Sequence, residues 1–278
     1  FLIICLGQMV IAQTATLTTS KSLRSSKRYF VRNILEDNQG GFYSIMIPKS
    51  KVYKSNDYVY VDYIDSSMNR RTHQILNLKD GQKRLRYEYL IEKNKKTWLF
   101  CSFLDKKSKK NSLFIQEIDK KTWKRVGVLK PIIQINYITH KDPGQFYFTY
   151  SSKGDDFLIF AQNPKGMHAG LKVEMSVMNN DLIVKDTQKL QWNTEYGNLK
   201  FKNVFYDGEH LAFFSRQLIS QEYVFYFRNN KNDKLSRKVV TAKGKSISDV
   251  EAYWDRDEIA CHGLYKETMD GTVSGVFS

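Results

Sequence analysis

Cysteine and proline are scarce in this sequence. Its 278 residues include three cysteines, four prolines and fifteen glycines. So few cysteines exclude a small domain held together by disulfides, and no Cys or His spacing typical of zinc sites occurs. No Pro-rich, Ser-rich or long single-sign tract marks a linker between domains. HExxH, GxSxG and phosphate-binding glycine loops are also missing, so no catalytic residue, metal ligand or cofactor is predicted.

Long apolar runs are rare as well. Phe1–Ile11 is too short to cross a bilayer, and no later segment approaches the roughly 20 apolar residues of a membrane span. The small-residue pattern ending at Ala12 resembles a signal-peptide cleavage site. We therefore expect residues 1–12 to be a signal-peptide remnant and residues 13–278 to form one domain, secreted or periplasmic or associated with the cell surface. Lipidation at Cys5 is the alternative, although Ile4 stands where that motif needs a small residue.

Aromatic residues are plentiful, at 14 %, and they fall in short alternating runs. The clearest unit is Phe146–Trp192, which contains two successive hairpins. The first, Phe146–Gln162, reverses around residues 152–155, and the second reverses at 179–181. Four short antiparallel strands in about 45 residues form a sheet that cannot bury its apolar face alone, so copies of it must stack.

Both hairpins recur along the chain. The turn of the second hairpin is repeated at intervals of 54, 60 and 50 residues, at Asp65, Asp119, Asn179 and Asn229. The first hairpin recurs at Phe201–Ser215 and Ile247–Tyr265. These intervals are near the repeat length of propeller blades, about 40 to 50 residues. We predict an all-β fold, a β-propeller-like (WD40/kelch-like) array of four-stranded antiparallel blades; a tandem of strands in a β-sandwich is the alternative.

The alternation also predicts which side chains are buried. The stretch 79–93 alternates as a strand, although part of it would fit a helix face. Cys101 and Cys261 are expected to be small buried residues, and a disulfide between them stays open because sequence does not give connectivity. One buried layer of successive blades is expected to hold Cys101, Phe160, Phe213 and Cys261. Exposed hairpin ends are expected at Lys107, Lys120 and Asn230.

Positive charge is in excess, with 44 Lys and Arg against 29 Asp and Glu and a net charge of +15. The lysines gather at predicted turns, where solvated lysine is common, so the simpler interpretation is a set of solvated hairpin tips. Nucleic acid is disfavoured, because aromatic and basic residues do not interleave on one strand face. The best candidates for contact with a polyanion are Lys93, Lys95, Lys96, Lys106, Lys107, Lys109, Lys110, Lys120, Lys121 and Lys124.

Histidine and acidic residues form no recognisable constellation. The five histidines are spread over separate hairpins and are expected at surfaces or strand ends: His73, His140, His168, His210 and His262. Acidic pairs at Asp155-Asp156 and in 255–258 suit tight turns better than a calcium site, which needs six to eight oxygen ligands. No carboxylate pair for glycoside hydrolysis can be nominated from the sequence.

The repeated Ile-Asp and Met-Asn hairpins, the segment ending at Ala12-Gln13 and the closing stretch 270–277 resemble secreted β-propeller-like proteins of bacteroidete-type bacteria, which are largely uncharacterised. The resemblance covers the chain from about Gly41 and implies no functional residue. It also implies that the array is incomplete at both ends. We favour an exported binding or scaffold module of the cell envelope with a protein or glycan partner. The alternative is a propeller hydrolase or lyase acting on an acidic polysaccharide; the oligomeric state is left open.

Overall fold

The computed structural model contains only β-strands as regular elements within the part of the chain that it describes. No described helix is long and apolar enough to cross a membrane. The all-β prediction is confirmed, and residues 79–93 form strands rather than a helix. The predicted signal segment 1–12 lies outside the described residues. These residues are 29–37, 39–48, 58–139, 141–151, 155–164, 171–192, 199–207, 210–217, 222–228, 235–242, 244–255, 258–268 and 271–277.

The described strands form five successive antiparallel sheets, called blades 1 to 5 here, of which the first four have four strands and the last has three. Blade 1 contains β1 (Tyr29–Glu36), β2 (Phe42–Pro48), β3 (Tyr58–Ile64) and β4 (Arg70–Asn77). Blade 2 contains β7 (Arg86–Lys93), β8 (Lys96–Asp105), β9 (Lys110–Asp119) and β10 (Lys124–Asn136). Blade 3 contains β11 (Gln145–Tyr150), β12 (Phe157–Gln162), β13 (Leu171–Met178) and β14 (Val184–Trp192). Blade 4 contains β15 (Leu199–Tyr206), β16 (Leu211–Gln217), β17 (Tyr223–Arg228) and β18 (Leu235–Val239). Blade 5 contains β19 (Ser246–Asp255), β20 (Glu258–Lys266) and β21 (Gly275–Phe277), and a separate hairpin joins β5 (Lys79–Asp80) to β6 (Lys83–Arg84).

The predicted repeat unit is confirmed as blade 3, in which β11 to β14 pair in chain order. The predicted turn anchors also close their turns. Asp65 accepts a hydrogen bond from the N–H of Asn69, and Asp119 accepts one from the N–H of Lys121. Asn179 accepts two such bonds within its own turn. Short polar side chains that bond nearby N–H groups stabilise a tight reversal, which is why these residue types recur at this position. The fourth anchor, Asn229, lies outside the described residues.

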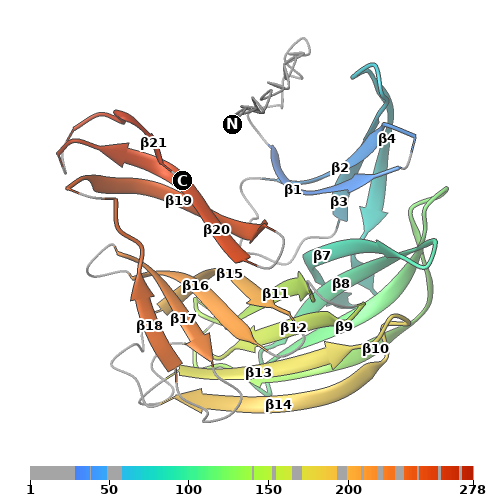
Figure 1. The fold of residues 1–278 in the computed structure, drawn as a ribbon. Helices are drawn as coiled ribbons and strands as arrows, with labels where there is room; N and C mark the ends of the chain where they lie inside the picture. Colours follow the sequence, from blue (N-terminus) through green and yellow to red (C-terminus); the bar gives the residue numbers. More distant parts are fainter. Residues whose placement is uncertain are drawn as a thin grey trace, which may run out of the picture.

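The blades follow one another around an arc, with the first strand of each blade on the inside and the last strand outside (Figure 1). Neighbouring first strands are joined directly. Asn33 of β1 donates to the carbonyl of Leu90 in β7 at 2.6 Å, and a parallel bridge joins Ser151, just after β11, to Tyr206 of β15. Because every blade starts on the inside and repeats the same order, the innermost strands β1, β7, β11, β15 and β19 share one direction. Their C-terminal ends therefore lie on the same side of the array of blades, and the ends in neighbouring blades are next to one another.

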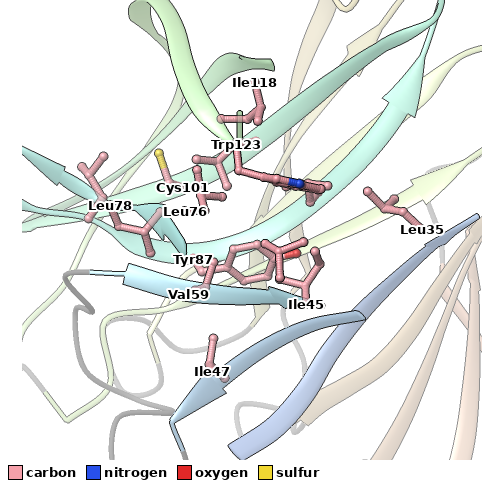
Figure 2. Close-up of a cluster of buried hydrophobic side chains, with 14 residues drawn as sticks. Leu35, Ile45, Ile47, Val59, Leu76, Leu78, Tyr87, Cys101, Ile118 and Trp123 are labelled. Atoms are coloured by element: carbon pink, nitrogen blue, oxygen red, sulfur yellow. The ribbon is translucent and has the colours of Figure 1, made fainter. Parts of the chain in front are cut away.

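Each hydrophobic cluster fills the space between two consecutive blades. The cluster between blades 1 and 2 is shown in Figure 2. Its indole comes from Trp123, which lies in the β9–β10 turn with a positive φ of 53° and is only 2 % exposed. The turn-forming lysines around Trp123 concealed this role in the sequence. The buried indole packs against the ring of Tyr43 from blade 1, with the two ring centroids 5.3 Å apart, and so contributes to the interface between blades 1 and 2.

The predicted buried layer is only partly correct. Cys101, Phe160 and Phe213 are fully buried, and Cys261 is half-buried. However, Phe160 faces the following blade, whereas Cys101, Phe213 and Cys261 face the preceding one. Phe160 therefore does not occupy the position equivalent to the other three, although its ring meets that of Phe213 in the cluster between blades 3 and 4. Every residue of β12 is buried, so both faces of this strand are apolar and alternation cannot tell one face from the other. Both described cysteines are free, so the disulfide alternative is not realised.

The predicted exposed hairpin ends had mixed outcomes. Lys107 is exposed, as expected. Lys120 is not, because its ammonium donates to Glu92 at 2.6 Å and lies 4.9 Å from the ring centroid of Tyr43. Asn230 lies outside the described residues.

Candidate functional site at the inner strand ends

The ten candidate lysines divide between the two ends of blade 2. Successive hairpins of an antiparallel sheet reverse at opposite ends, so lysines that are near in sequence are separated in space. The β8–β9 turn, at one end, carries Lys106, Lys107, Lys109 and Lys110. The β7–β8 and β9–β10 turns, at the other end, carry Lys93, Lys95, Lys96, Lys120, Lys121 and Lys124.

Half of the lysines at this second end are held by the protein itself. Lys96 pairs with Glu117 at 2.8 Å, and Lys120 pairs with Glu92. Lys93 donates to the carbonyl of Asp155 at 2.5 Å and lies 5.3 Å from the centroid of a tyrosine ring in blade 3. These ammonium groups support contacts within and between blades. The predicted polyanion surface is therefore smaller than the count of lysines suggests.

A pocket of about 500 Å³ opens at this same end, where the innermost strands of three blades meet. Its walls are residues 33–36 of β1, residues 89–93 of β7, Asn94 and Lys95 of the β7–β8 turn, and Tyr150 at the end of β11. A smaller pocket of about 240 Å³ lies between blades 3 and 4. Its described lining residues are Met175, Gln188, Tyr206, Leu211 and Arg228, none of which carries a carboxylate.

Two tyrosines give the larger pocket an aromatic wall. The Tyr89 ring stacks on Phe148 of blade 3, with centroids 4.9 Å apart and planes 8° from parallel. Burial raises the pKa of Tyr89, and burial together with the neighbouring Tyr89 raises the pKa of Tyr150 to about 12. Both hydroxyls are therefore neutral at physiological pH and can donate hydrogen bonds. Tyr150 is 41 % exposed, so part of its ring is available to a ligand.

Two carboxylates lie in the same pocket, Glu36 at the end of β1 and Glu92 near the end of β7. They differ in their surroundings. Glu92 is half-buried against Lys120, while Glu36 is exposed. Neither residue was nominated from the sequence, because they are 56 positions apart and are brought together only by the stacking of blades 1 and 2. Their shared place at the C-terminal end of an innermost strand was the signal that could have identified them.

The β7–β8 turn is fixed to the pocket rim by the neighbouring blade. The side-chain amide of Asn94 donates to the carbonyl of Asn180 at 3.0 Å and to the carboxylate of Asp181 at 3.2 Å. Both acceptors belong to the β13–β14 turn of blade 3. Asn94 and Lys95 have φ values of 53° and 61°, the left-handed pair that a two-residue hairpin loop requires. The rim is thus a tight turn tied across the interface between blades.

Bulges on the innermost strands add further ties. The register shifts by one residue near Asn33, Asn203 and Asp249, and each of these side chains accepts the N–H of the residue that follows it. Asn203 also donates to a carbonyl of β19 at 3.3 Å, as Asn33 does to β7. A bulge redirects the strand and frees an amide to reach sideways. An asparagine at a bulge therefore links neighbouring innermost strands at two interfaces, between blades 1 and 2 and between blades 4 and 5.

The histidines remain isolated among the described residues. His73 bonds to Asp62 at 2.5 Å, and His210 bonds to Asp207 at 3.0 Å. His262 lies beside the ring of Tyr253. No group of three potential metal ligands occurs in the described part of the chain. His140 and His168 lie outside it.

The acidic turns singled out in the sequence contribute to no group of three potential metal-binding side chains among the described residues. Asp156 pairs with Lys185 at 3.0 Å, and the carbonyl of Asp155 binds Lys93. The second turn includes residues 256 and 257, which lie outside the described residues. Neither Asp155 nor Asp156 is among the residues that line the pocket.

Comparison with known proteins agrees with the fold. The sequence matches no protein-family model and no curated protein. Among solved structures, an α-L-arabinanase from Penicillium chrysogenum complexed with arabinobiose has a TM-score of 0.56 at 9 % identity, covering 89 % of this chain and 80 % of that one. A variant of an α-L-arabinofuranosidase from Fusarium graminearum with an iminosugar inhibitor has a TM-score of 0.51 at 9 % identity, covering 85 % and 77 %. At this identity the likeness defines the class, an all-β propeller.

Proposed function

We propose that this protein is a carbohydrate-active propeller that binds an acidic polysaccharide in the pocket at the ends of β1, β7 and β11 and hydrolyses it there. The observation that carries the proposal is the meeting of Glu36 and Glu92 with two tyrosines in one pocket of about 500 Å³. Clefts of this size suit small ligands, and they commonly lie where strand ends converge. The similar propellers named above act on or bind sugars, which supports the proposal.

The two carboxylates suit different steps of glycoside hydrolysis. The reaction needs one carboxyl group to protonate the leaving oxygen and a second, ionised one to activate water or attack the sugar. Lys120 holds the Glu92 carboxylate in a hydrogen bond of 2.6 Å, so we assign Glu92 the second role. Glu36 is the other carboxyl group of the pocket wall, so we assign it the proton-donating role.

The tyrosines suit the binding of a sugar ring. The apolar faces of pyranose rings pack on aromatic rings, and the exposed part of Tyr150 offers such a surface beside both carboxylates. The neutral hydroxyls of Tyr89 and Tyr150 can donate to sugar oxygens. Acidic and basic side chains both line the pocket, so it can discriminate between sugars by their charge.

The second candidate is a binding module of the cell envelope without catalysis. The exposure of Glu36 favours it, because catalytic acids are commonly found in surroundings that exclude water. In this case the pocket would hold a glycan without cleaving it. Export from the cytoplasm is part of both candidates and stays a prediction, tested by fractionating cells that express the full reading frame.

Incubation with acidic and neutral polysaccharides, followed by a reducing-end assay, tests the proposal. Acidic polymers should yield new reducing ends, and Glu36→Gln or Glu92→Gln should each lower the rate at least about 100-fold, as expected for loss of a general acid or base. Glu117→Gln is the matched control, since Glu117 is also paired with a lysine in blade 2 but lies outside the pocket wall. Binding without any product would support the envelope module, and neither binding nor product would reject both candidates.

A further inference from the structure

We infer that Lys95 is the residue that selects an acidic sugar, by pairing its ammonium with the anionic group on the ring that enters the pocket. The inference rests on the proposed function, because it assigns a specificity-determining residue to the same pocket. It concerns a carboxylated or sulfated sugar unit, since either presents a negatively charged oxygen group that one lysine can bind.

The partners of the other lysines single out Lys95. At this end of blade 2, Lys93 donates to the Asp155 carbonyl, Lys96 pairs with Glu117 and Lys120 pairs with Glu92. Lys121 and Lys124 do not line the pocket. Lys95 lines it, and no hydrogen bond or ion pair engages its ammonium among the described residues. It is therefore the pocket cation that is available to a ligand.

The backbone at Lys95 supports a role for its side chain. Its φ of 61° is the left-handed conformation in which side chains other than glycine are strained. Two-residue hairpin loops of this kind prefer Asn followed by Gly, and here Asn94 is followed by lysine. Glycine would relieve the strain, so the choice of lysine is not explained by the stability of the turn. A strained residue on a binding rim is a reason to examine its side chain for function.

The turn also holds the Lys95 backbone in place. Asn94 is bonded to the β13–β14 turn of blade 3 through both of its amide hydrogen bonds. The ammonium is thereby carried by a rigid rim, and only its own alkyl chain remains free to adjust. The Lys95 ammonium is thus carried by a short, anchored turn on a pocket that has an aromatic wall. This arrangement suits the binding of an anionic group on a sugar ring that stacks on that wall.

Lys95→Gly tests the inference in two independent measurements. Removal of the strain should leave the melting temperature unchanged or raise it by about 1 to 3 °C. Removal of the charge should weaken binding of galacturonate oligomers about tenfold, as expected for loss of one charge-assisted hydrogen bond. Binding of the same oligomers as methyl esters, which are neutral, should not change. Lys121→Gly, on the same end of the blade but outside the pocket, should leave both affinities as in the wild type.

The two sources of the anionic group are separated by a sulfated oligosaccharide measured in parallel. Whichever acidic ligand the wild type prefers should be the one whose affinity falls in Lys95→Gly. Retention of the full preference for the acidic ligand in Lys95→Gly would overturn the inference. Preference of the wild type for methyl esters would overturn it too, while leaving the pocket as a sugar site; absence of binding to every sugar would instead reject the proposed function.

Discussion

Truncation of Phe213 tests whether the blades pack as described. Its ring is completely buried between blades 3 and 4, stacks on Phe201 with centroids 4.8 Å apart and meets Phe160 edge-on at 5.7 Å. Phe→Ala in a core costs about 3 to 5 kcal/mol. Each aromatic pair adds about 0.5 to 1.5 kcal/mol beyond the buried area. The two ring contacts place Phe213 in the upper part of the range for Phe→Ala, so we expect this substitution to lower the free energy of unfolding by about 4 to 5 kcal/mol.

Urea denaturation followed by tryptophan fluorescence measures this cost. Phe30→Ala is the matched control, because Phe30 is also on a strand but is 47 % exposed, and its truncation should cost less than about 1 kcal/mol. In a double-mutant cycle, Phe160→Ala and Phe213→Ala should be coupled by about 1 kcal/mol because their rings touch. A cost near 1 kcal/mol for Phe213→Ala, or additive effects of the pair, would refute the packing of blade 3 on blade 4.

Three further predictions concern charge and thiols. Lys120→Met should cost about 1 kcal/mol through loss of its contacts with Glu92 and Tyr43, discounted for their partial exposure, whereas Lys121→Met should stay within about 0.5 kcal/mol in the same denaturation assay. The Lys202 ammonium and then the Tyr223 hydroxyl hold the pKa of Asp249 below its usual range, so its stabilising contribution is present above about pH 4 and lost as the pH falls through the lower folded-state pKa. Asp249→Asn should therefore be less stable than the wild type at pH 6, and a gap that does not narrow below pH 4 would contradict this. Burial raises the pKa of Cys101 to about 12, so in a Cys5→Ser background a thiol reagent at pH 8 should label half-buried Cys261 first and Cys101 only on unfolding.

The repeat unit could be predicted because its signals are local. Alternation along β13 and the Asx turn at Asn179 each depend on fewer than ten neighbouring residues. The first strand of blade 1 was not predicted, because β1 has a bulge after Val31 and leaves Phe30 and Ile34 exposed, which breaks the alternation. Local pattern therefore determines the blades wherever one strand face is clearly buried.

The candidate site could not be predicted, because contacts between blades create it. Lys120 was expected to be solvated, yet its partner Glu92 is 28 positions away and on a different strand. The division of ten lysines between two ends follows from strand direction, which becomes visible only after the hairpins have been assigned. Net charge indicated a class of ligand, whereas the pocket depends on the spatial order of the strands.

Each hydrophobic cluster is confined to one pair of consecutive blades, and this confinement affects the order in which the blades unfold. Among the described residues no cluster spans three blades, so we expect cooperativity to pass from each blade to its neighbour, as in a linear chain of coupled units. Blade 5, with three strands and a partly exposed β20, is coupled on one described side, whereas β12 of blade 3 is buried throughout. Amide exchange should therefore begin in β20 and β21 and reach β12 last. The described residues that line the pocket all belong to blades 1 to 3, so opening of β20 and β21 should leave the pocket formed.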